Sequence, residues 1–108
     1  MSDSTTPPMI ASQNGHFPVV GTLIISGADP FIEKDDGATA LYQAALRGNT
    51  KVVQMLLSTG VPLTHKSFDY ETVLHGAARG NRIETVRYIL QQDESNELVN
   101  EKRNVYNF

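Results

Sequence analysis

Three histidines are the residues of this sequence best suited to catalysis or metal binding. They are His16, His65 and His75, and they stand far apart in the chain. A histidine serves as a general base or a metal ligand when acidic, nucleophilic or further ligating side chains accompany it at a suitable spacing. No such side chain recurs beside these three at a catalytic or metal-binding spacing. We therefore expect no enzyme activity, no cofactor and no metal site.

A second group that could do chemistry is the arginine cluster Arg79, Arg82 and Arg87. Such a cluster could contact phosphate, but Glu84 stands within it, and mixed charge on a helix is typical of a solvated face. None of the glycines is accompanied by the lysine that a nucleotide-binding loop needs. An enzyme or nucleic-acid binder that uses these arginines remains the rival hypothesis. A turnover screen or a salt-dependent binding titration would distinguish it.

The bulk composition limits the classes of protein further. The net charge of −3 disfavours a general role on nucleic acid or membrane surfaces, and the chain has no cysteine for disulfide or thiolate chemistry. No apolar run is long enough to span a bilayer, and the polar start of the chain lacks a secretory pattern. We expect an intracellular protein, cytoplasmic or nuclear, that folds as one domain.

The dominant pattern in the sequence is a helical hairpin at residues 41–57. Its first arm places Leu41, Ala44 and Ala45 at helical spacing, and its second arm places Val52, Val53 and Leu56 on a similar stripe. The hairpin turns at Gly48, and related apolar positions recur after roughly 33 residues in both directions. The recurring sets are Leu74, Ala77, Ala78, Val86, Ile89 and Leu90, and Ala11, Ser12, Val19, Val20, Leu23 and Ile24.

The motifs within each unit resemble the ankyrin repeat. They are Thr6-Pro7, Gly15-His16 and Gly27-Ala28-Asp29 in the first unit, Asp36-Gly37, Thr39, Ala44-Ala45, Gly48-Asn49 and Gly60 in the second, and Thr72, Leu74-His75, Ala77-Ala78 and Ile83-Glu84 in the third. The resemblance implies an all-α solenoid of stacked helix pairs with short β-hairpin fingers. It divides the chain into units at about 1–33, 34–66 and 67–102, followed by a tail or incomplete unit at 103–108.

The helix bounds follow from caps and turn residues. We predict helices at 7–13, 19–26, 40–47, 51–58, 73–80 and 83–92. Gly27 and Gly48 suit the left-handed conformation at turns, and Asn81 tolerates the same conformation at the position equivalent to Gly48. The resemblance also implies a bond between His75 and the capping Thr72. In the second finger Tyr70 stands where the first has glycine, so we expect a different turn there.

The resemblance further implies that another protein binds at the finger tips and the first helix of each pair. The corresponding residues are Asp35, Asp36, Ala38, Leu46, Arg47, Lys66, Phe68, Asp69, Glu71 and Arg79. Phe68 is the unusual member, because an aromatic side chain at an exposed tip often anchors an interface. Its alternative role is structural, with the ring folded back over Tyr42 or Leu46. We predict that Phe68→Ala weakens partner capture without lowering the melting temperature. The other open reading is that the chain belongs to a larger ankyrin protein whose activity lies elsewhere.

The last expectation concerns the C-terminal end of the stack. The third pair has the same apolar stripes as the second, yet no complete unit follows it. An uncapped repeat exposes apolar surface, so we expect marginal stability and an end that self-associates or docks on a further repeat. Val105, Tyr106 and Phe108 offer the alternative of an apolar lid.

Overall fold

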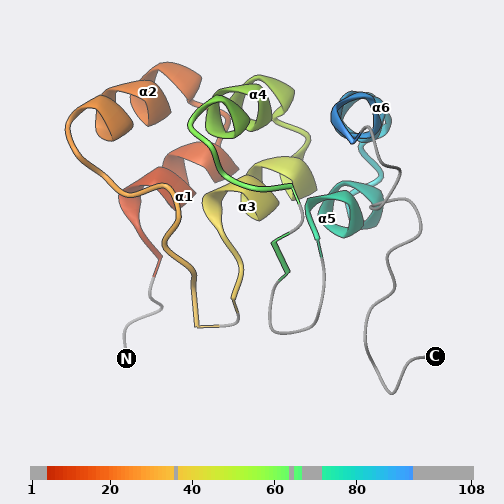
Figure 1. The fold of residues 1–108 in the computed structure, drawn as a ribbon, viewed down its shortest axis with the longest axis horizontal. Coiled ribbons are helices and arrows are strands. Elements are labelled where there is room, and N and C mark those ends of the chain that lie inside the picture. The colour runs from red at the N-terminus through yellow and green to blue at the C-terminus, as the bar shows by residue number, and fades with distance from the viewer. Residues whose placement is uncertain (1–4, 36, 64, 67–71, 94–108) are drawn as a thin grey trace.

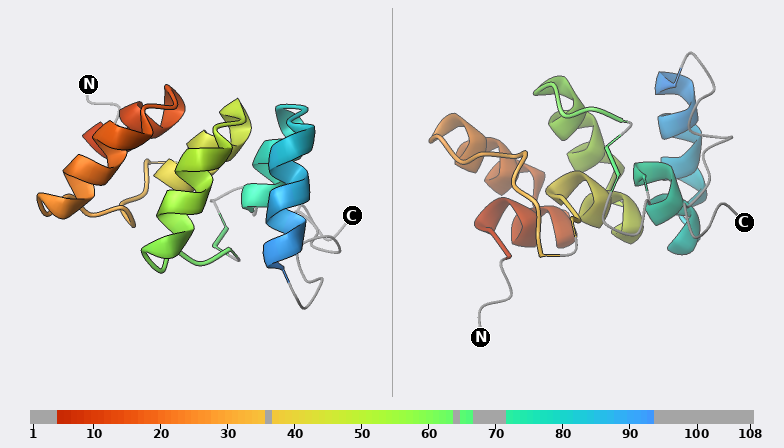
Figure 2. Two further views of the ribbon diagram at one scale, coloured as in Figure 1. Left: turned by 90° about the horizontal axis from the view of Figure 1, so that it is seen from above. Right: turned by 60° about the horizontal axis from the view of Figure 1, so that its bottom comes forward.

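Six helices form the part of the chain that the computed structural model describes, residues 5–35, 37–63, 65–66 and 72–93. They are α1 (Pro7–Gln13), α2 (Phe17–Ile25), α3 (Ala40–Arg47), α4 (Thr50–Ser58), α5 (Val73–Arg79) and α6 (Ile83–Gln92). Figure 1 shows α1, α3 and α5 in one layer and α2, α4 and α6 in a second layer above it. Figure 2 shows the three helix pairs side by side in chain order. The predicted all-α stack of helix pairs is confirmed.

The first helix of each pair begins at a threonine, and the three threonines recur at the repeat spacing. Thr6 Oγ1 accepts from the Met9 amide at 3.4 Å, and Thr39 Oγ1 accepts from the Tyr42 amide at 3.3 Å. Thr72 starts α5 with a capping box that involves His75. A threonine cap satisfies amides that a helix start leaves without partners. These caps fix where each pair begins.

The turn inside each pair depends on one residue with positive φ. Gly48 has φ 77° between α3 and α4, and Asn81 has φ 58° between α5 and α6. Asparagine and glycine are the residues that best tolerate this conformation. The predicted equivalence of Gly48 and Asn81 is confirmed.

The core lies between the layers and between neighbouring pairs. α3 is the central helix and packs against both α1 and α5. Its Ala44 and Ala45 are fully buried, and Val53 and Leu56 of α4 are fully buried behind them. Small side chains on α3 let the neighbouring backbones approach, while the larger ones on α4 fill the space that remains.

The observed helix bounds differ from the predicted ones by one or two residues. α2 begins at Phe17 and α4 at Thr50, and α5 ends at Arg79. Differences of this size are usual at helix ends, where the last turns fray. None of the helices in the described ranges is long and apolar enough to cross a membrane.

The first finger is a turn, and the described residues contain no strand. The Lys34 amide donates to the Ala38 carbonyl at 2.7 Å, and the Gly37 amide donates to the Lys34 carbonyl at 2.8 Å. This closure forms a tight loop in place of the β-hairpin pairing that the resemblance implied. The predictions for the turn at Tyr70 and for the segment 103–108 fall outside the described residues.

Candidate functional site

The predicted binding residues divide into exposed, buried and undescribed groups. Asp35, Arg47, Lys66 and Arg79 are exposed, and Leu46 is half-buried. Ala38 is only 4% exposed, so its side chain packs inward and offers no binding surface. The remaining four, Asp36, Phe68, Asp69 and Glu71, lie outside the described residues.

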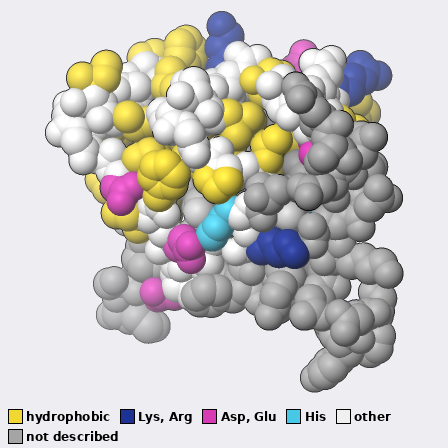
Figure 3. All heavy atoms as spheres, in the orientation of Figure 1, with side chains coloured by type: hydrophobic (Ala, Val, Ile, Leu, Met, Phe, Trp, Pro, Cys, Tyr) yellow, Lys and Arg dark blue, Asp and Glu magenta, His cyan; other side chains and the backbone are white. Residues whose placement is uncertain are grey.

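One face of the molecule divides into an apolar part and a more polar part. On the face shown in Figure 3, hydrophobic side chains gather over α2, α4 and the loops that follow them. Acidic side chains, a histidine and a basic side chain lie lower on that face, at the finger side. The finger side is therefore the more polar part of this face.

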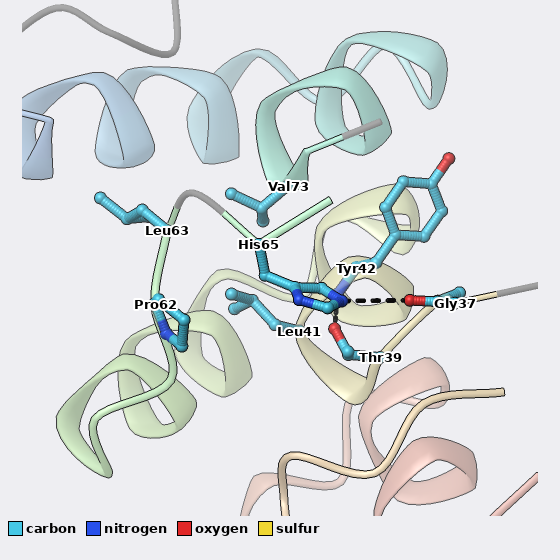
Figure 4. A pocket seen from close by; sticks show the side chains of 9 residues that line it. Gly37, Thr39, Leu41, Tyr42, Pro62, Leu63, His65 and Val73 are labelled. Carbon is cyan, nitrogen blue, oxygen red and sulfur yellow. Dashed lines mark hydrogen bonds between the residues drawn. The ribbon is translucent and has the colours of Figure 1, made fainter. Parts of the chain in front are cut away.

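His65 links the second finger to the first, a role that the sequence did not indicate. Its Nε2 lies 3.2 Å from the Gly37 carbonyl oxygen and 3.4 Å from Glu33 Oε2. An Nε2–H donor to the Gly37 carbonyl satisfies a backbone acceptor in the turn of the first finger. Figure 4 shows His65 lying against this turn. The contact fixes the two fingers relative to each other.

A small pocket lies beside His65. Leu41, Tyr42, Leu63 and Val73 contribute to its walls (Figure 4). Its volume is about 10 Å³, room for a single water at most. The pocket is a packing gap under the second finger and has no room for a substrate.

Two polar side chains form hydrogen bonds between neighbouring helix pairs. Asn49 Nδ2 donates to the carbonyls of Ser12 at 2.6 Å and Gln13 at 3.0 Å. Arg82 Nε donates to the Leu46 carbonyl at 3.0 Å. Asn49 and Arg82 occupy equivalent positions, directly after the residue with positive φ. Each donates to carbonyls at the end of the preceding first helix, where a helix leaves backbone acceptors without intrahelical partners. The Ser12 carbonyl also accepts from the Gly15 amide at 3.2 Å.

Two arginines of the cluster, Arg82 and Arg87, have different surroundings. Arg82 is engaged with the Leu46 carbonyl, across the boundary between the second and third pairs. Arg87 instead lines an open groove between α4 and α6, together with Lys51, Glu84 and Tyr88. The mixed charge of this groove matches the solvated helix face that the sequence indicates.

The histidines do not converge. His75 Nδ1 accepts from the Thr72 amide at 3.0 Å, as the resemblance implied, and His16 is exposed at the start of α2. Within the described ranges, no group of three or more histidine, aspartate or glutamate side chains could hold a metal ion.

Comparison with known proteins gives one family and several partial relatives. A family model described as ankyrin repeats, three copies, matches residues 8–102. The chain is 35% identical over 86 residues to the probable E3 ubiquitin-protein ligase XBOS33 of rice, covering 79% of this chain and 16% of that protein. It is 43% identical over 61 residues to mouse ankyrin repeat and SAM domain-containing protein 6, covering 54% of this chain and 7% of that protein.

A third relative belongs to another class of protein. The chain is 38% identical over 69 residues to the human transient receptor potential cation channel subfamily A member 1. That match covers 64% of this chain and 6% of the channel. The chain thus spans only a small part of the relatives that it matches.

Proposed function

Since this chain belongs to the ankyrin repeat family, we propose that it is a non-catalytic module that binds another protein. The binding surface consists of the finger tips and the first helices of the pairs. Ankyrin repeats generally mediate protein binding, and a stack of small units offers a broad, rigid surface to a partner. The exposed side chains on that surface determine which protein binds, because the fold alone does not specify the partner.

The observation that carries this proposal is the exposure of charged residues from successive units. Asp35 follows the first pair, Arg47 ends α3, Lys66 lies in the second finger and Arg79 ends α5. All four are exposed. Charged residues of both signs on one scaffold favour a partner with a mixed polar surface, because complementary charge steers association and sets specificity. Phe68 is proposed as the apolar anchor within this surface.

A second candidate is that the module serves a larger protein whose activity lies outside these residues. Its support is that each reported relative is many times longer than the matched segment. The rice relative is named as a ubiquitin ligase, yet the match to it is through the repeats only. In this case the module would recruit a partner to an activity that another domain supplies.

Quantitative affinity capture tests the proposed surface. The baits are the wild-type chain, a variant carrying Asp35→Ala, Arg47→Ala and Phe68→Ala, and a control carrying Lys51→Ala and Gln54→Ala on α4. The proposal expects the first variant to lose the captured partner while the control retains it, with all baits matched in melting temperature. Equal capture by both variants, or loss with the α4 control alone, would contradict the proposed surface.

A further inference from the structure

The N-terminal end of the stack exposes the positions that later pairs use to contact their predecessor. Val19 on α2 is 48% exposed, whereas its equivalents, Val52 and Thr85, are 0% and 1% exposed. Ile10 on α1 is likewise exposed, whereas its equivalent Gly76 is buried against Tyr42. The first pair therefore presents an apolar surface with the layout of an internal unit boundary.

The opposite end of the stack exposes the complementary positions. Ala78 on α5 is exposed, although its equivalents, Ser12 and Ala45, are fully buried. Ile83 at the start of α6 is 62% exposed. Its equivalent in the second pair is Thr50, which contacts the third pair. The third pair thus presents the surface that normally receives a following unit.

One internal contact shows how the two ends would meet. Thr50 Oγ1 lies 2.7 Å from Thr85 Oγ1, which joins α4 of the second pair to α6 of the third. One repeat further along, the position of Thr50 is occupied by Ile83. The position of Thr85 in a following first pair is occupied by Val19. A polar pair inside the stack is thus replaced by an apolar pair at its two ends.

We propose that the two ends of the stack bind each other between copies of this chain, head to tail. The third pair of one copy stacks on the first pair of the next, with Ile83 against Val19 and Ala78 in the place of the buried Ala45. The contacts between successive pairs inside the stack show the geometry that the contact between two copies would adopt.

Glu84 and Arg87 stand at the positions of Lys51 and Gln54, which line the internal groove, but α1 and α2 carry no charged side chain, so no like-charge repulsion opposes the contact. This interface lies at the ends of the stack and leaves Asp35, Arg47 and Lys66 of the proposed surface available. Arg79, the equivalent of Leu46, lies at its edge.

The head-to-tail arrangement has a definite signature in solution. A heterologous contact of this kind leaves one unused end on each added copy, so assembly continues unless the rotation closes a ring. A symmetric contact between two N-terminal ends would instead stop at a dimer. The two arrangements therefore differ both in size distribution and in which residues they require.

Sedimentation velocity over a concentration series tests the proposal with three variants of the full chain. Val19→Asp changes the N-terminal end and Ile83→Asp changes the C-terminal end. Phe31→Asp is the control, because Phe31 is also an exposed apolar residue, at 48%, but lies in the loop after α2, outside the helices that would meet. The wild type and the control should form species larger than dimers as concentration rises. Each end variant should weaken self-association by roughly tenfold or more, since a buried carboxylate without a partner opposes the contact.

Mixing the two end variants gives the decisive result. The Val19→Asp chain keeps an intact C-terminal end, and the Ile83→Asp chain keeps an intact N-terminal end. Together they should form a one-to-one heterodimer, although each alone is monomeric. A wild type that stays monomeric at every concentration would overturn the proposal. So would an Ile83→Asp chain that still dimerises, which would indicate contact between N-terminal ends. Circular dichroism melts check that every variant is folded, and Val19→Ser replaces any Val19→Asp chain that is not.

Discussion

Replacing Gly80 with alanine should separate the second and third helix pairs. Gly80 has an ordinary φ of −81°, so its conformation does not require glycine. Space is the constraint, because a Cβ atom at this position would lie 2.1 Å from the Leu46 carbonyl oxygen. That oxygen belongs to the backbone and cannot rotate away. The two backbones must separate by about 0.9 Å to restore even a close contact of 3.0 Å.

The free energy of unfolding should fall by about 2 kcal/mol. Overpacking of a close contact typically costs about 1–3 kcal/mol. The separation also lengthens the bond from Arg82 Nε to the Leu46 carbonyl, and a hydrogen bond of this kind contributes about 1 kcal/mol. Against these stands a gain of about 0.4–1 kcal/mol, because alanine restricts the unfolded chain. For a domain of this size the melting temperature should drop by about 8–16 °C.

Thermal and urea unfolding followed by circular dichroism measures this change, and Gly21→Ala is the matched control. A Cβ at Gly21, inside α2, would meet Met55 Sδ at 3.5 Å, which is ordinary van der Waals contact. Gly21→Ala should therefore stabilise the chain by about 0.5–1 kcal/mol through helix propensity. A Gly80→Ala chain as stable as the wild type would refute the proposed close approach of α3 and α5.

Four further substitutions test three local features, each by chemical unfolding. Ser12 Oγ is fully buried without a hydrogen-bond partner, so Ser12→Ala should stabilise the chain by about 1 kcal/mol; a loss of stability would indicate a bond that the structure lacks. Asn49→Ala removes two hydrogen bonds to carbonyls of α1 and should lower the free energy of unfolding by about 1–2 kcal/mol. An unchanged midpoint of unfolding would show that these two bonds do not stabilise the fold. Gly48→Val should lower stability by more than about 1 kcal/mol at φ 77°, whereas Asn81→Gly at φ 58° should be neutral or stabilising; equal effects would contradict their equivalence.

The repeat spacing allowed most of the fold to be predicted. Thr39 predicted the start of α3, and the equivalence of Gly48 and Asn81 predicted two turns of the same conformation. These features depend on local backbone preferences, which are visible in a single sequence. The exposure of Arg47 and Arg79 was also predictable, since both end a helix whose buried stripe is clear.

The contacts between units could not be predicted from local pattern. His65 was assigned no role, yet it bonds to the Gly37 carbonyl of the first finger. Ala38 was placed on the binding surface, but the closed turn of the finger buries it. Gly80 gave no indication of a close approach, because its neighbour Leu46 lies in another unit. Such features depend on how far apart two pairs sit, which the repeat period does not specify.

Lysine footprinting of the chain with its captured partner tests the proposed binding surface most directly. Lys66 lies in the second finger and Lys51 lies on α4 with its Nζ 5.2 Å from the centre of the Phe17 ring, and both lysines are exposed. Acetylation rates measured by mass spectrometry compare the two lysines in the same sample, with and without partner. Binding at the finger side predicts that the partner slows acetylation of Lys66 and leaves the rate at Lys51 unchanged. Protection of Lys51 with no change at Lys66 would contradict the proposed surface.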